Sequence, residues 1–239
     1  MTSYLSTKPI PAHERLIFAL DVPGSETAKE LVHTLGDSVC FYKLGLELFM
    51  ADGYFELVRW LADQGKKIMI DLKLFDVPET VRLAVRQLRK YPATFATVHG
   101  NDAILEAAVK EKGDLKILAV TVLTSLDQND LKDLGFECRV EDLVLSRARR
   151  ALQIGCDGVV SSGLEAPRLR ESLGDKFLVV APGIRPVQNV DDQKRTVNVE
   201  QAFKNGADHI VVGRPIRDAK APRQAAEDIQ HQIAALFRK

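Results

Sequence analysis

This chain of 239 residues has few cysteines, no long apolar run and no surplus of charge of either sign. Its three cysteines, Cys40, Cys138 and Cys156, lack metal-binding spacing, so we expect no disulfide framework and a reducing, cytoplasmic location. Thirty-three Lys and Arg balance thirty-three Asp and Glu, which argues against nucleic acid or a membrane surface as a partner. We find no signal peptide and no membrane-spanning run. The partner we expect is therefore a small molecule.

What the chain does contain is a regular succession of short apolar runs. Eight runs of strand length occur, at residues 16–21, 40–45, 68–73, 95–100, 115–122, 158–162, 177–182 and 209–213. Amphipathic helical stretches such as 102–112 and 140–154 lie between them, and the stretch 221–237 follows the last run. Near-continuous apolar strands alternating with helices predict an α/β fold, a closed eight-stranded parallel (β/α)8 TIM barrel. An open doubly wound sheet usually has a glycine-rich first turn, which residues 19–24 lack.

We expect one domain over residues 1–239. Residues 1–14 are polar and contain two prolines, and we interpret them as a loose N-terminal arm.

A cluster of charges follows the third apolar run. Ile68 to Lys73 reads as a buried strand that leads into Asp71, Lys73 and Asp76, and Pro78 then opens a helix. Side chains two apart on a strand share a face, so Asp71 and Lys73 should point the same way. A single Asp-x-Lys is often only a strand-end ion pair. Three such charges at the mouth of a buried strand require pairing or a function, because an unpaired buried ion costs several kcal/mol.

Polar residues also end the other strands. Catalytic groups of a (β/α)8 barrel project from the carboxyl ends of its strands. The residues at these ends are Asp21, Lys43, Asp71, Lys73, His99, Thr124, Arg185 and Arg214. Asp21 could instead cap the following helix, and Lys43 could be an ordinary cation. We interpret His99 as a hydrogen-bonded structural residue and assign it no role.

The last two strands predict a phosphate site. The segments Pro182-Gly-Ile-Arg185 and Gly213-Arg214-Pro215 place backbone amides and guanidinium groups where barrels commonly hold phosphate. The polar stretch 186–195 is long for a connection, and it is either a lid over the phosphate or a solvated loop.

The charge cluster also carries a family resemblance. Asp71-Leu-Lys73-Leu-Phe-Asp76-Val-Pro-Glu-Thr80 resembles the Asp-x-Lys-x-x-Asp signature of bacterial orotidine 5'-phosphate decarboxylases. The resemblance extends over nearly the whole chain, through segments 19–21, 43–45, 120–125, 182–185 and 211–214. Phe75 is a departure, since many relatives of this type have His there.

This resemblance implies decarboxylation of orotidine 5'-phosphate to UMP in de novo pyrimidine biosynthesis, without cofactor or metal. Lys73 would stabilise the C6 carbanion and protonate it, and Asp71 would stress the substrate carboxylate. Lys43, Asp71, Lys73 and Asp76 would form a chain of alternating charges.

The resemblance also implies substrate contacts and a dimer. Asp21 would bind a ribose hydroxyl, Thr124 the pyrimidine edge, with Ser125 as a second contact, and Gln193 both phosphate and pyrimidine. The full set of expected substrate-binding residues is Asp21, Lys43, Thr80, Thr124, Pro182, Arg185, Gln193, Gly213 and Arg214. Asp76 and Thr80 would reach the site of a second subunit in a homodimer.

Two alternatives stay open at this stage. A related sugar-phosphate barrel enzyme, a hexulose-phosphate synthase or keto-gulonate-phosphate decarboxylase, shares the Asp-x-Lys-x-x-Asp element but uses a divalent metal. Lys43 argues against it, because an acid is expected at that position. A non-catalytic nucleotide-binding protein is the second alternative, although it has no evident use for four buried charges.

Overall fold

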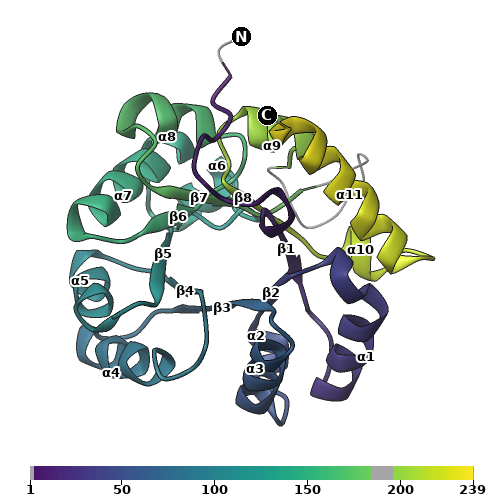
Figure 1. Ribbon diagram of the computed structural model, residues 1–239. Coiled ribbons are helices and arrows are strands. Elements are labelled where there is room, and N and C mark those ends of the chain that lie inside the picture. The colour runs from purple at the N-terminus through teal and green to yellow at the C-terminus, as the bar shows by residue number, and fades with distance from the viewer. Residues whose placement is uncertain (1–2, 185–195, 239) are drawn as a thin grey trace.

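A closed barrel of eight parallel strands forms the centre of the computed structural model, which describes residues 3–184 and 196–238. Each strand pairs with the next, and β1 closes on β8 through Leu16 opposite Ile210. Figure 1 shows the strands as an inner ring with the helices outside it. The strands are β1 Leu16–Ala19, β2 Phe41–Leu44, β3 Lys67–Leu74, β4 Phe95–Val98, β5 Lys116–Val120, β6 Gly158–Val160, β7 Leu178–Ala181 and β8 His209–Val212. The predicted (β/α)8 fold is confirmed.

The helices lie between these strands and after the last of them along the chain, as the amphipathic stretches indicated. They are α1 Ser25–Leu35, α2 Leu46–Phe49, α3 Tyr54–Asp63, α4 Pro78–Leu88, α5 Asp102–Glu111, α6 Gln128–Asp133, α7 Val140–Ile154, α8 Ala166–Leu173, α9 Val199–Lys204, α10 Arg214–Arg217 and α11 Pro222–Phe237, with 3-10 turns η1 Ala12–Glu14 and η2 Gly36–Ser38. Pro78 opens α4 as expected, since a first-turn proline lacks only a donor that the helix does not use.

Two cores explain why the strands read as continuous apolar runs. Successive side chains of a strand point to opposite faces, so alternate residues of β1 enter different cores. Leu16 and Phe18 pack outward under the helices, whereas Ile17 and Ala19 fill the barrel interior. The interior core consists of Ile17, Ala19, Phe41, Met69, Phe95, Leu118, Val180 and Val211.

The N-terminal arm is attached more firmly than expected. Ser6 Oγ donates to Asp208 Oδ1 at 2.6 Å, and Lys8 Nζ forms an ion pair with the same oxygen at 3.0 Å. Tyr4 N also donates to the Lys204 carbonyl at 2.9 Å. The expectation of a loose arm is therefore wrong, because its polar side chains have a buried carboxylate to bind. In Figure 1 this segment crosses the end of the barrel beside β1 and β8.

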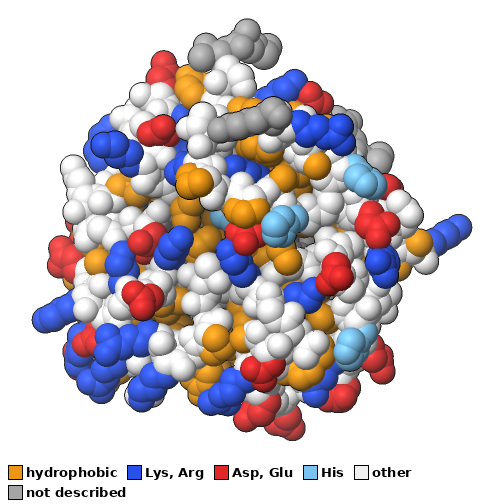
Figure 2. All heavy atoms as spheres, in the orientation of Figure 1, with side chains coloured by type: hydrophobic (Ala, Val, Ile, Leu, Met, Phe, Trp, Pro, Cys, Tyr) orange, Lys and Arg blue, Asp and Glu red, His pale blue; other side chains and the backbone are white. Residues whose placement is uncertain are grey.

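The surface carries charges of both signs. Figure 2 shows acidic and basic side chains scattered over the whole visible face, with hydrophobic side chains between them. Within residues 3–184 and 196–238, no helix combines the length and apolar character that a membrane span needs.

Candidate active site

A cavity of about 490 Å³ opens at the carboxyl ends of the strands. Asp21, Lys43, Asp71 and Lys73 enter it from the first three strands and the segments that follow them. Thr124, Pro182, Gly213 and Arg214 line its other side. The structure therefore brings together eight of the residues predicted from sequence, as expected for the mouth of such a barrel.

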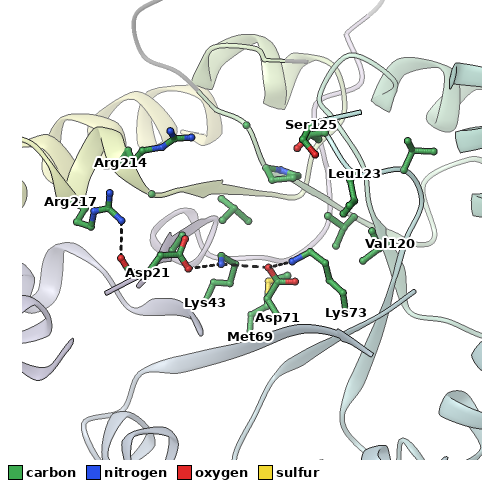
Figure 3. A pocket seen from close by; sticks show the side chains of 18 residues that line it. Asp21, Lys43, Met69, Asp71, Lys73, Val120, Leu123, Ser125, Arg214 and Arg217 are labelled. Carbon is green, nitrogen blue, oxygen red and sulfur yellow. Dashed lines mark hydrogen bonds and ion pairs between the residues drawn. The ribbon is translucent and has the colours of Figure 1, made fainter. Parts of the chain in front are cut away.

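The four charges form one continuous chain (Figure 3). Lys43 Nζ lies 3.0 Å from Asp21 Oδ1 and 3.5 Å from Asp71 Oδ2. Lys73 Nζ lies 3.0 Å from the same Oδ2 of Asp71. One carboxylate oxygen thus receives two ammonium groups.

Burial and charge act in opposite directions on the pKa values of this chain. Burial alone would lower the pKa of Lys43, but Asp71 and Asp21 raise it above its ordinary value. Burial would raise the pKa of Asp71, but Lys43 and Lys73 hold it below the usual range. Both groups are therefore charged at neutral pH. The buried pair supplies a fixed electrostatic field beside the cavity.

The end of β3 is irregular where it presents Lys73. Ile70 pairs with Ala96 and Leu74 with Val98, so three residues of β3 face the single Thr97. Lys73 has φ +48°, and it is the one non-glycine residue with positive φ among those described. The regular alternation that we expected through Lys73 is therefore interrupted. Asp71 and Lys73 nevertheless meet, and the bulge redirects the lysine at the cavity.

A glycine makes room for the first link of the chain. A Cβ atom on Gly45, directly after β2, would lie 3.1 Å from both Asp21 Oδ1 and Lys43 Nζ. Such contacts are tighter than side chains normally tolerate. A larger residue at this position would require the Asp21 carboxylate or the Lys43 ammonium to shift by a few tenths of an ångström.

Two arginines from α10 lie at the opposite side of the cavity. Arg214 and Arg217 both line it, three residues apart and so on one face of the helical turn. Arg217 Nη1 donates to the Asp21 carbonyl at 2.8 Å, which ties α10 to the end of β1. Gly183 and Gly213 bring backbone to the same side. These groups give the cavity a cationic end suited to phosphate.

Several predicted residues lie elsewhere. Asp76 and Thr80 are exposed and do not line the cavity of their own chain; Asp76 Oδ1 accepts from the Val77 amide at 2.6 Å. Arg185, Gln193 and the proposed lid 186–195 fall outside the described residues.

His99 lines a different cavity, of about 450 Å³. Its Nδ1 has no hydrogen-bond partner within the part of the chain that the structure describes, which differs from the hydrogen-bonded role expected for that side chain.

Sequence reasoning missed Thr97 and Arg217. Thr97 Oγ1 donates to Asp71 Oδ1 at 2.9 Å from a fully buried position on β4. A threonine in an apolar strand looks like any other β-branched residue, so nothing marked it. The three-residue spacing from Arg214 to Arg217 after a strand end was the available signal for the second arginine.

A family model described as orotidine 5'-phosphate decarboxylase / HUMPS family matches residues 14–229. The chain belongs to this family. Orotidine 5'-phosphate decarboxylase from Methylococcus capsulatus is 64% identical over 239 residues, covering 99% of each chain. That from Xanthomonas euvesicatoria pv. vesicatoria is 50% identical over 230 residues, covering 95% of each.

A solved structure agrees with this assignment. The crystal structure of orotidine 5'-phosphate decarboxylase from Lactobacillus acidophilus matches with a TM-score of 0.82 and 36% identity, covering 92% of this chain and 99% of that chain. The resemblance predicted from Asp71 to Thr80 is thus confirmed. The family description names two groups, and the curated relatives above carry the decarboxylase name.

Proposed function

We propose that this chain decarboxylates orotidine 5'-phosphate to UMP without a cofactor, in de novo pyrimidine biosynthesis. The relatives named above support the reaction. The observation that carries the mechanism is the Lys73 ammonium, held 3.0 Å from the buried Asp71 and one-third exposed to the cavity. A fixed cation is what an anion developing at C6 requires.

The bond between C6 and the carboxyl carbon breaks, CO2 leaves, and the electron pair remains on C6 in the ring plane. That pair is poorly delocalised into the ring, so the protein must stabilise it electrostatically. Lys73 stabilises this charge and donates an Nζ proton to C6, which completes UMP. The lysine then regains a proton from solvent.

Asp71 has two roles in this proposal. Its Oδ2 holds both lysines in place, and its negative charge opposes the substrate carboxylate before CO2 leaves. Two like charges about 4 Å apart repel by roughly 4 kcal/mol at an effective dielectric of about 20, or about three decades in rate. Enzymes typically lower barriers by about 8–23 kcal/mol. Repulsion is therefore the smaller contribution, and the preorganised Lys73 is the larger.

Binding energy from the phosphate end supplies the rest. Arg214, Pro182 and Gly213 form the proposed phosphate end of the cavity, and Thr124 the pyrimidine edge. Arg185 and Gln193 remain proposed ligands of the same nucleotide. Interactions remote from C6 hold the substrate against the charge chain. Their binding energy therefore helps to lower the barrier at C6.

The proposed working unit is a homodimer. Asp76 and Thr80 are exposed in one chain and would contribute to the site of the second. Phe75 and Val77, which flank Asp76, are 70% and 61% exposed, as an uncovered apolar contact would be. Mixing Asp76→Ala with Lys73→Ala chains should restore one intact site per heterodimer. Inactive heterodimers would contradict sharing.

The decisive assay follows the absorbance loss of orotidine 5'-phosphate with purified protein, with and without EDTA. Equal turnover in both conditions supports the proposal. Activity abolished by EDTA would instead favour the metal-dependent sugar-phosphate enzymes, and tight nucleotide binding without turnover would favour a non-catalytic binder. The proposed location is the cytoplasm, and the free state of Cys40, Cys138 and Cys156 is compatible with it.

A further inference from the structure

Thr97 occupies a singular position opposite the β3 bulge. It lies on β4 between Ala96 and Val98. Ala96 pairs with Ile70 of β3, and Val98 pairs with Leu74. Its side chain lies on the same face of β4 as Phe95, inside the barrel, and is only 1% exposed. The bulge leaves Thr97 facing Asp71 and Lys73 together.

One hydroxyl group binds both of these residues. Thr97 Oγ1 donates to Asp71 Oδ1 at 2.9 Å and accepts from the Lys73 amide at 2.9 Å. The direction of each bond is fixed, since an ionised carboxylate only accepts and an amide N–H only donates. The Thr97 hydroxyl proton therefore points to Asp71 Oδ1, and these two bonds allow no other direction of donation.

The two carboxylate oxygens of Asp71 have different partners. Oδ1 is bound by Thr97, whereas Oδ2 faces Lys43 at 3.5 Å and Lys73 at 3.0 Å. A hydrogen bond to one oxygen restrains the rotation of the carboxylate about its Cβ–Cγ bond. The hydroxyl thus sets where the other oxygen holds the two ammonium groups.

The same hydroxyl also supports an unusual backbone. Lys73 has φ +48°, a conformation that costs a non-glycine residue free energy and persists only when its surroundings enforce it. The bond from the Lys73 amide to Thr97 is one such constraint, because it replaces a regular strand contact across the bulge.

We propose that Thr97 is a positioning residue for the decarboxylation, which orients the Asp71 carboxylate and the Lys73 backbone as one unit. Its side chain does not line the cavity, and it acts through these two residues. The inference rests on the proposed function, in which Lys73 is the catalytic cation.

The test compares Thr97→Val, which keeps the side-chain shape and removes the hydroxyl, with Thr97→Ser, which keeps the hydroxyl. Positional errors near 1 Å cost about a hundredfold in rate, so kcat of Thr97→Val should fall on the order of a hundredfold. Affinity for UMP should change little, because the phosphate end of the cavity is untouched. Thr97→Ser should retain most of the wild-type kcat.

Thr121→Val is the matched control. Thr121 directly follows β5, is equally buried, and donates its hydroxyl to the Val160 carbonyl at 2.9 Å outside the charge chain. If buried hydroxyls matter only for folding, Thr121→Val and Thr97→Val lose stability alike and keep kcat. A selective loss of kcat in Thr97→Val, restored in Thr97→Ser, supports positioning.

Wild type and Lys73→Ala are assayed alongside. A normal kcat in Thr97→Val beside an inactive Lys73→Ala overturns the inference and leaves the proposed function intact. An inactive wild type, or a fully active Lys73→Ala, overturns the proposed function itself. If Thr97→Val does not fold, Thr97→Cys replaces it, since a thiol is similar in size and a weak hydrogen-bonding group. Equal kcat in Thr97→Cys and Thr97→Ser would then refute positioning.

Discussion

Two buried aspartates at opposite ends of the barrel differ in how completely they are satisfied. Asp208, just before β8, is fully buried; its Oδ1 accepts from Ser6 and its Oδ2 from Arg170 at 2.7 Å and from the Val179 amide at 2.9 Å. Asp71, at the other end, lies between two ammonium groups, and that of Lys73 still faces a cavity.

The difference separates a structural charge cluster from a catalytic one. Around Asp208, the cations bind other groups of the protein. Arg170 also donates to the carbonyls of Gly206 and Phe177. Around Asp71, the geometry holds a cation in place without enclosing it. A similar composition of acids and bases therefore stabilises the fold at one end and is available to a ligand at the other.

Removing the cavity-facing cation should have the largest effect on activity. Lys73→Ala should lower kcat by at least about a thousandfold, because it removes both the stabilising charge and the proton donor. Stability should change little, since the side chain is 34% exposed. Turnover of orotidine 5'-phosphate and urea denaturation measure the two effects. Lys67→Ala, at the other end of β3, removes an equal charge and should leave kcat normal.

Breaking the structural cluster around Asp208 should lower stability and leave kcat unchanged. Asp208→Ala leaves Arg170 and Lys8 without their carboxylate and should cost about 3–5 kcal/mol of unfolding free energy, as for a broken buried pair. Urea denaturation measures this, and kcat per folded molecule should be unchanged. Glu227→Ala breaks only the exposed pair with Arg223 and should cost less than about 1 kcal/mol. Equal losses in both variants would refute the distinction.

A buried histidine beside Asp208 should make the structural end sensitive to pH. Burial lowers the pKa of His209 from 6.5 to about 4, and its ring packs against Phe41 and Phe95. Below pH 6.5 the unfolded chain binds a proton that the folded chain excludes, so stability falls as pH falls. The loss between pH 6.5 and 4 should be roughly 3 kcal/mol greater in wild type than in His209→Gln. Urea denaturation of both proteins at each pH measures this loss. An equal loss of unfolding free energy in both proteins across this range would contradict the prediction.

The smallest expected effect concerns the N-terminal arm. Lys8→Ala removes an ion pair with Asp208 but leaves Arg170 and Ser6 in place, so about 1 kcal/mol of stability should be lost. Differential scanning calorimetry would detect the lower melting temperature. A normal kcat should accompany it, and a reduced kcat would mean that the two ends are coupled.

Strand positions and most of the site could be predicted from the sequence because both depend on local pattern. Apolar runs located the barrel strands, and a residue at the carboxyl end of a parallel strand necessarily lies at the mouth. Asp21, Lys43 and Asp71 were found in this way, and the cavity contains them.

Features that depend on distant or irregular contacts were not predictable. The left-handed backbone of Lys73 has no signature in composition, because residues other than glycine rarely adopt it. Asp208 and Arg170 are 38 residues apart, and no spacing rule connects them. The firm attachment of Ser6 and Lys8 to Asp208 was missed for the same reason.

The closure of β1 onto β8 has a consequence for how the site is assembled in time. All four linked charges lie between residues 21 and 73, whereas the proposed phosphate-binding groups lie beyond residue 181. A nascent chain therefore contains all four charged residues long before it contains the residues proposed to bind the phosphate. Synthesis of the final strand both seals the cylinder and joins the two halves of the chemistry, so an abortive fragment would carry the charges without the means to recruit a substrate.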